Sequence, residues 1–257
     1  MLTLILTSML TLAFDVQPVR AEPRTWTVDD DGPADFHTIR EAIDAASDGD
    51  TIFVYDGTYG PTVVDKALSL VGENKSITII EGNPPYPYHG TVSVLASGAN
   101  ISGFTVRNSY PFYGIALGNW THLWWGEIIS EITVSDNFLY DCTRGITVVD
   151  CDRIVIADNL ITRTKIAGIE CSDSTNCQIV NNTITNNLGY GIVDSGKVIL
   201  SHEVPAYNNI CHNTITCNNI GISVSAINDT LTNNIIACNK RTGMEKVWGP
   251  NNAIFRN

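Results

Sequence analysis

Residues 154–184 read IVIADNLITRTKIAGIECSDSTNCQIVNNTI, and the unit Asn-x-Ile occurs in them at Asn159 and again 23 residues later at Asn182. The unit, with Ile or Leu in third place, recurs along the second half of the chain and begins at Asn137, Asn159, Asn182, Asn213 and Asn234. Phe104-Thr105-Val106 looks like an earlier copy that lacks the asparagine. The intervals are 33, 22, 23, 31 and 21 residues, so the basic period is about 22 residues and the two long intervals contain insertions.

Other positions keep register with this anchor. An apolar residue stands three positions before it, and a glycine followed by Ile or Met stands eight or nine positions after it, at Gly145, Gly168, Gly191, Gly221 and Gly243. Each unit is therefore three short apolar strands that cannot bury their own apolar side without stacking on the next unit. The pattern predicts an all-β, right-handed parallel β-helix (a solenoid). A β-sandwich rarely keeps one asparagine at one spacing, and propeller blades need about 40 residues.

The repeated asparagine and glycine predict the bends of each coil. Asparagine tolerates the left-handed backbone conformation, and stacked amides can hydrogen-bond from coil to coil as a ladder. We expect the glycine to supply a second bend with positive φ.

The first residues differ from the rest of the chain. The apolar stretch 2–14 is shorter than the roughly 20 residues that span a bilayer, and Val19-Arg20-Ala21 offers a signal-peptidase site before Glu22. We therefore predict a signal peptide over 1–21, although no basic residue precedes the apolar stretch; the alternative is a buried N-terminal strand or helix. No later apolar run reaches membrane length, so we expect no transmembrane anchor in the mature chain.

The mature domain is predicted over 22–257. Its N-terminal cap spans about 25–60 and includes a short helix with Asp35 as its N-cap, and its repeats run from about 100 to 257. The last residues look like part of another coil, so we expect the domain to be truncated at its C-terminus. The formal net charge of −12 and the pI near 4.6 argue against a nucleic-acid partner.

Two parts of the chain resemble a known family. Residues 25–46 (TWTVDDDGPADFHTIREAIDAA), followed by GDTIFV at 49–54, resemble the N-terminal cap of pectin-lyase-like β-helix proteins. Residues 68–72 and 101–109 (ISGFTVRNS) are similar to the copper-accessory NosD-like family. The resemblance covers residues 25–257 and implies the fold. The resemblance does not specify the function, because the same scaffold occurs in lyases, hydrolases, epimerases and esterases as well as in proteins without known chemistry.

Stacking would gather acidic residues from neighbouring coils. These form a candidate stripe of Asp150, Asp152, Glu170, Asp173 and Asp194. Carboxylates about 5 Å apart favour a bound cation between them, so the stripe predicts a calcium or sugar site. The alternative is the solvated face of an acidic protein.

Aromatic residues cluster in the first insertion, at Trp120, Trp124 and Trp125. Exposed rings commonly stack on sugars, so these are candidate sugar contacts; alternatively they cover the apolar side of a long loop. The histidines have no metal-ligand spacing and only three methionines are present, so no metal site, copper included, is predicted.

Seven cysteines lie in the second half, without a CxxC pair that would indicate structural zinc. Cys217 and Cys238 each stand four residues after an anchor asparagine. In stacked coils their Cα atoms would lie about 5 Å apart, inside the disulfide range. A Cys217–Cys238 bridge is one prediction, and two stacked reduced thiols are the other.

These observations favour an exported or cell-surface β-helix that contacts a polysaccharide or cell-envelope glycan, or is structural, without strong catalysis. Calcium is the one cofactor that the acidic stripe indicates. The first alternative is a secreted polysaccharide lyase or glycoside hydrolase, and the second is a NosD-like copper-maturation accessory protein.

Overall fold

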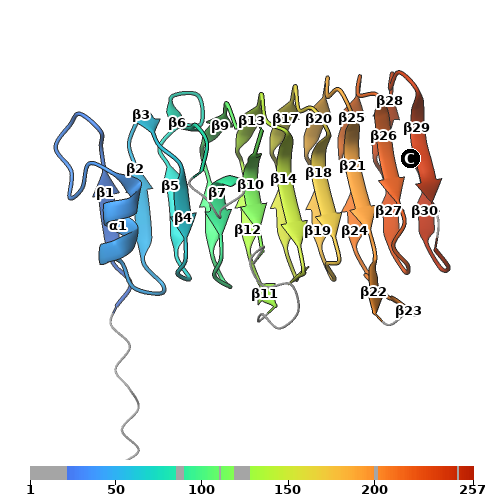
Figure 1. Cartoon of the computed structure of the whole chain (residues 1–257), viewed down its shortest axis with the longest axis horizontal. Coiled ribbons are helices and arrows are strands. Elements are labelled where there is room, and N and C mark those ends of the chain that lie inside the picture. Colours follow the sequence, from blue (N-terminus) through green and yellow to red (C-terminus); the bar gives the residue numbers. More distant parts are fainter. Residues whose placement is uncertain (1–21, 85–89, 110, 119–127, 200–201, 248) are drawn as a thin grey trace, which may run out of the picture.

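The computed structural model describes residues 22–84, 90–109, 111–118, 128–199, 202–247 and 249–257. Figure 1 shows coils of strands stacked side by side along the long axis, with the short helix at the N-terminal end. Three long sheets run the length of the stack, and all their strand pairs are parallel. The chain is therefore an all-β, right-handed parallel β-helix with one short capping helix, as the sequence predicts.

Each coil contributes one strand to each of three sheets. Sheet A has the order β1 (Thr25–Val28), β2 (Thr51–Val54), β5 (Ser69–Gly72), β8 (Asn100–Ser102), β12 (Thr133–Ser135), β16 (Val155–Ala157), β19 (Gln178–Val180), β24 (Asn209–Cys211), β27 (Thr230–Thr232) and β30 (Ala253–Phe255). Sheet B has β3 (Gly57–Tyr59), β6 (Thr78–Glu81), β9 (Thr105–Arg107), β13 (Phe138–Tyr140), β17 (Leu160–Thr162), β20 (Thr183–Thr185), β25 (Thr214–Thr216) and β28 (Ile235–Ala237). Sheet C has β4 (Thr62–Val64), β7 (Gly90–Val94), β10 (Tyr113–Leu117), β14 (Arg144–Val149), β18 (Ala167–Ser172), β21 (Tyr190–Ser195), β26 (Ile220–Val224) and β29 (Thr242–Val247). The regular stack begins at β2, well before residue 100 where the sequence repeats become obvious.

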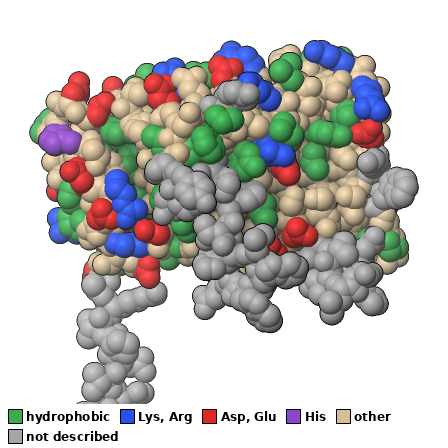
Figure 2. Space-filling model, viewed as in Figure 1, with side chains coloured by type: hydrophobic (Ala, Val, Ile, Leu, Met, Phe, Trp, Pro, Cys, Tyr) green, Lys and Arg blue, Asp and Glu red, His purple; other side chains and the backbone are tan. Residues whose placement is uncertain are grey.

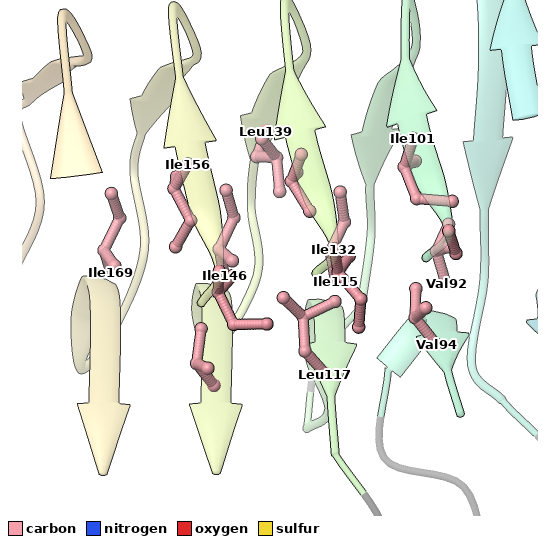
Figure 3. Packing of buried hydrophobic residues seen from close by; sticks show 14 of the residues in the cluster. Val92, Val94, Ile101, Ile115, Leu117, Ile132, Leu139, Ile146, Ile156 and Ile169 are labelled. Carbon is pink, nitrogen blue, oxygen red and sulfur yellow. The ribbon is translucent and has the colours of Figure 1, made fainter. Parts of the chain in front are cut away.

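The core consists of like residues stacked on like. Ile146 lies in register with Ile169, and Ile169 with Ile192, and all three are fully buried. Figure 3 shows such side chains pointing from the sheets into the interior of the coil. Burying one Ile side chain stabilises the fold by about 1.5–3 kcal/mol, so the stacks are the main source of stability.

The corner between sheets A and B holds a ladder of amides. Its five asparagines, Asn137, Asn159, Asn182, Asn213 and Asn234, are 0–3% exposed. Each accepts hydrogen bonds from the preceding coil; Asn182 Oδ1, for example, accepts from both the backbone N–H and the side-chain amide of Asn159, each at 3.0 Å. The left-handed residue is not the ladder asparagine, however, but the residue before it, such as Asp158 with φ 58°. The ladder asparagine is free to point its amide inward because its neighbour makes the bend.

The repeated glycines do not make bends, so this expectation was wrong. None of Gly145, Gly168, Gly191, Gly221 and Gly243 has a positive φ. They lie within strands of sheet C, where a Cβ on Gly145 would stand 2.6 Å from Ile161 Cγ2 and 2.5 Å from the carbonyl oxygen of Gly168. At Gly145, Gly168, Gly191 and Gly221 the next coil approaches too closely for a Cβ, whereas at Gly243 the nearest atom would be 3.3 Å away.

The N-terminal helix α1 (Ile39–Ala45) begins later than the sequence pattern indicates. Its N-cap is Thr38, whose side chain accepts from the Glu41 backbone N–H while Glu41 bonds back to Thr38. This capping box leaves Asp35 to accept hydrogen bonds from the backbone N–H and the hydroxyl of Thr27, at 2.9 Å each. At seven residues α1 is short, and no helix in the described ranges is long and apolar enough to cross a membrane.

Two short sheets stand apart from the three long ones. β11 (Ile129–Ser130) pairs with β15 (Cys151–Asp152). The second insertion, in the long interval between Asn182 and Asn213, contains an antiparallel pair, β22 (Lys197–Ile199) and β23 (His202–Val204). The second insertion thus leaves the coil as a hairpin that pairs only with itself. The predicted signal peptide and the insertion at 119–127 lie outside the described residues.

Candidate functional site

The corner between sheets B and C carries an open groove with a volume of about 580 Å³. We call it the corner groove; its lining residues are Asn108, Asp141, Arg163, Lys165, Asn186 and Leu188. Four of these, Asn108, Asp141, Arg163 and Asn186, occupy one equivalent position in successive coils, directly after the strand of sheet B, and all have φ between 54° and 57°. The left-handed bend turns each of these side chains outward on a rigid corner.

Arg163 is the most constrained side chain of the corner groove. Its Nε and Nη2 donate to the two carboxylate oxygens of Asp141 at 2.9 and 3.0 Å, and its guanidinium lies 4.6 Å from the centre of the Tyr140 ring. The bidentate pair uses two of the five N–H donors of the guanidinium. Arg163 remains 56% exposed, so it is oriented by Asp141 and still accessible to a ligand.

Apolar side chains lie beside these charges. Leu188 is 64% exposed and Ile166 is 40% exposed, and the two belong to the same corner, since Leu188 N–H donates to Thr164 and Tyr190 N–H to Ile166. Figure 2 shows hydrophobic, basic and acidic side chains intermixed on the upper part of this face. The corner groove therefore combines hydrogen-bonding groups with an accessible apolar surface.

The adjoining outer face of sheet C extends the polar surface. Arg144 and Glu170 form an ion pair in which each side chain is about one fifth exposed, and Arg144 lies 5.1 Å from the centre of the Tyr113 ring. Further along, the Tyr190 hydroxyl donates to Glu245 at 3.2 Å. These pairs hold charged groups in fixed positions next to the corner groove.

The predicted acidic stripe is divided among three places. Asp150 and Asp173 stack on the corner that follows sheet C, because Asp150 N–H donates to Ser172 and Asp173 N–H to Ser195. Glu170 lies on the outer face of sheet C, in register with Thr147.

Asp152 is half-buried beside Asp150 and pairs with Arg153. Burial raises its pKa, but hydrogen bonds from Asn176 and Thr175 outweigh burial and leave the pKa of Asp152 below its usual value. This carboxylate is therefore committed to contacts within the protein.

Asp194 points into the interior and does not lie with the surface carboxylates. It is 1% exposed, and both its oxygens accept from the side-chain amide of Asn208, at 3.1 and 3.0 Å. Asp229, also fully buried, accepts from the Asn208 backbone N–H at 2.9 Å and lies beside Asp194. Burial raises the pKa of Asp229 to about 6, and burial together with the neighbouring Asp229 raises the pKa of Asp194 well above its usual range.

Asp229 belongs to a further ladder, on the corner between sheets C and A. The members Asn208, Asp229 and Asn252 each accept the backbone N–H of the preceding coil, at 2.8–2.9 Å. Asp229 stands where neighbouring coils have an amide, so this ladder holds a carboxyl group in place of one NH2 donor.

The remaining predicted site residues are the three tryptophans of the first insertion and the pair Cys217 and Cys238. Trp120, Trp124 and Trp125 lie outside the described residues. Cys217 and Cys238 occupy the same left-handed corner in successive coils, with the Cys217 N–H donating to Ala237 at 3.3 Å; their bridge stays a prediction. Within the described residues, the one group of three or more acidic, histidine or cysteine side chains close enough to share a metal ion is Asp29, Asp30 and Asp31, not the stripe.

The corner groove was missed from the sequence although its signal is present. Asp141, Arg163 and Asn186 stand four residues after an anchor asparagine, the same register position that Cys217 and Cys238 occupy. Reading that position for charged and amide side chains, as well as for cysteine, would have found the groove.

Comparisons with known proteins agree on the fold. The A-module of the mannuronan C-5 epimerase AlgE4 from Azotobacter vinelandii superposes with a TM-score of 0.52 at 12% identity, over 84% of this chain and 90% of that one. XylC in complex with xylose gives 0.60 at 12% identity, over 90% and 68%. The pectin methylesterase from Aspergillus niger gives 0.53 at 16% identity, over 88% and 89%. At these identities the likeness shows the fold alone.

Sequence comparison identifies the family. None of the curated proteins matches the chain. The family model NosD, described as a periplasmic copper-binding protein, matches residues 43–256. Since this match spans well over half of the chain, the protein belongs to the NosD family and is an exported β-helix protein, secreted, periplasmic or at the cell surface.

Proposed function

We propose that this protein binds a polysaccharide, such as a cell-envelope glycan, in the corner groove and does so without strong catalysis. The observation that carries the proposal is the combination of the oriented Arg163 with the exposed apolar surface of Leu188 in one groove of about 580 Å³. Sugars present hydroxyl groups around a ring with apolar C–H faces, so a sugar site needs both kinds of contact.

Rigidity supports the same conclusion. The groove residues sit on corners that are held by buried amides behind them; Thr164, next to Arg163, donates from its backbone N–H and its hydroxyl to Asn187, at 2.8 Å each. A preorganised surface pays little entropy on binding, which favours affinity for a flexible chain such as a glycan. The parallel stack also repeats the corner at the strand spacing, so an extended polymer meets equivalent positions along it.

Isothermal titration calorimetry with soluble neutral and uronic-acid polysaccharides tests the proposal. We expect saturable binding by at least one glycan, and at least a tenfold loss of affinity in the double variant Arg163→Ala, Leu188→Ala. The matched control is Arg153→Ala, which removes an exposed arginine that is ion-paired with Glu131 on the corner between sheets C and A.

Two outcomes would overturn the proposal. One is that no glycan of the panel binds to protein whose fold is verified by circular dichroism. The other is that the double variant binds as tightly as the Arg153→Ala control.

Incubating the protein with the same polysaccharides distinguishes binding from the enzymatic alternative. A polysaccharide lyase would generate unsaturated ends and a glycoside hydrolase new reducing ends. Reproducible turnover that is lost in Asp150→Asn or Asp173→Asn would replace the binding proposal with catalysis at the neighbouring corner.

Copper binding, which the family description names, finds little support in the donor set. Soft ligands such as thiolates and imidazoles select copper. Of the cysteines, five are buried, and burial raises the pKa of Cys142 to about 11 and of Cys151 to about 12, which disfavours the thiolate form that a metal needs. In the described part of the chain no histidine or cysteine belongs to a group of three or more such side chains close enough to share an ion.

A further inference from the structure

Two buried thiols, those of Cys171 and Cys177, lie beside Asp194, and the thiol of Cys151 lies near them. Cys171 is an inward-facing residue of β18, and Cys177 follows it after the turn at residues 173–176. They are 0% and 1% exposed, and their thiols lie next to each other, each in the free form. Cys151, at 2% exposed, lies one coil earlier, and its thiol contacts the backbone carbonyl of Val149 at 3.2 Å.

All seven cysteines lie in the described residues, and Cys177 is the one in direct contact with Cys171; Cys151 acts on both thiols only through its charge. Cys142 contacts the Ser109 hydroxyl at 3.5 Å and a backbone carbonyl. Cys211 lies on sheet A, and Cys217 and Cys238 lie on the opposite corner of the coil. Proximity therefore favours one partner for Cys171, six residues further along the chain.

We propose that Cys171 and Cys177 form a disulfide bond as the exported chain folds. The oxidant is a small-molecule or protein disulfide of the oxidising compartment. Thiolate attack first forms a mixed disulfide, and the second cysteine then displaces the remaining thiol. One S–S bond is broken and one is formed, and the two electrons and two protons of the cysteines leave on the two released thiols.

The order of events follows from burial. In the folded protein the adjacent Cys177 thiol and burial raise the pKa of Cys171 well above its usual range, and the negative charge of Asp194 adds to this. Thiolate formation, and with it exchange, is therefore suppressed once β21 and Asn208 cover the pair. The bond forms before the next coil closes, and afterwards it is sheltered from reductants.

The bond would fasten the end of sheet C to the start of the next sheet A strand. It closes the short turn that carries Asp173, one of the corner carboxylates, on the coil next to Asp150. It also replaces two S–H groups, buried among Val148, Ile179 and their neighbours, by an apolar bridge.

Trypsin provides a direct test, because the tryptic peptide from Ile166 to Lys197 contains Cys171 and Cys177 and no other cysteine. The full chain is exported, purified without reductant, alkylated in the native state, and then denatured and digested. We expect this peptide two hydrogen masses lighter than its dithiol form and unalkylated. It should resist reductant in native buffer and take up two alkyl groups only after denaturation and reduction.

The matched control is Cys151→Ser, which removes a thiol of the same buried stack and should leave the light peptide unchanged. Wild-type material in which the Ile166–Lys197 peptide carries two free thiols after denaturation would overturn the proposal. So would a link from this peptide to the Gly145–Arg153 peptide, which contains Cys151 as its one cysteine. Both outcomes are read on the unmutated protein, so neither depends on the folding of a variant.

Discussion

Gly168 lies so close to the next coil that a Cβ added to it would stand 2.5 Å from Ile184 Cγ2 and 2.8 Å from the backbone oxygen of Gly191. The Gly191 oxygen cannot move without separating the strands of sheet C. Gly168→Ala should therefore lower the free energy of unfolding by about 1–3 kcal/mol, the usual cost of overpacking. Urea unfolding followed by circular dichroism measures this. Gly60→Ala is the control, because nothing lies within 4 Å of its added Cβ; an equal loss in both variants would contradict the packing explanation.

Removing one amide of the ladder should lower the free energy of unfolding, because a buried donor of the preceding coil loses its acceptor. In Asn182→Ala, the backbone N–H of Asn159 loses its acceptor while it remains buried, whereas the side-chain amide of Asn159 keeps the carbonyl oxygens of Val134 and Ala157. One buried donor without a partner costs about 1–3 kcal/mol, so the urea midpoint should fall clearly. Thr183→Ala, at the neighbouring exposed position, should change it by only a few tenths of a kcal/mol. Similar midpoints for the two variants would show that water replaces the ladder bonds.

The buried carboxyl pair predicts a stability that decreases with pH. A carboxyl whose pKa is raised by folding holds more protons in the folded state between its two pKa values, so stability falls as pH rises through that interval. For Asp229 the interval runs from about 3.8 to about 6, and the raised pKa of Asp194 acts in the same direction. Asp229→Asn supplies the amide that the ladder has at neighbouring coils and removes one charge.

We therefore expect Asp229→Asn to stabilise the protein at pH 7.5 by on the order of 1–3 kcal/mol and to flatten the decline of the urea midpoint above pH 5. Carboxylates with lowered pKa values, such as Asp50, lose their contribution below this range and do not obscure the comparison. A variant whose midpoint declines as steeply as that of the wild type would contradict the raised pKa of Asp229.

The predicted Cys217–Cys238 bridge differs from a buried disulfide in its response to reductant. Cys217 is partly exposed and Cys238 is exposed, so a bond between them should be reduced in native buffer without unfolding. Cys211, Cys217 and Cys238 share one tryptic peptide, and cleavage before Asp229 then separates Cys238 from the other two. A link that persists in Cys211→Ser identifies Cys217 as the partner; free alkylation of both cysteines in native material, with no link, ends the prediction.

The repeats allowed the sequence to predict the fold because each coil makes the same contacts as the next. The spacing of Asn159 and Asn182 alone placed their amides in register. Local backbone conformation was harder to predict: the left-handed bend falls on Asp158, not Asn159, and Gly168 is needed for packing and not for a bend. Both errors came from assigning each residue its commonest backbone conformation. In this fold, contacts with the neighbouring coil determine the role of the residue instead.

The site was predicted less well, for a physical reason. Register shows which residues share a position, but not whether a side chain points inward. Asp194 occupies a core position that holds Val224 in the next coil, and a single substitution of polar for apolar cannot reveal that Asn208 satisfies it from inside. The groove around Arg163 depends on the bend that turns side chains outward, which only the backbone shows.

The ladders have a direction. At each corner the backbone N–H of one coil donates to a side-chain oxygen of the following coil. Asn159 donates to Asn182, Asn187 to Asn218 and Asn208 to Asp229. The ladder donors of a coil therefore gain their acceptors only when the next coil has folded onto it. Until then these unpaired donors form a template on which the next coil can fold. For a polypeptide that crosses a membrane N-terminus first, this polarity lets folding proceed in step with translocation, each turn fixing the last while the remainder is still extended.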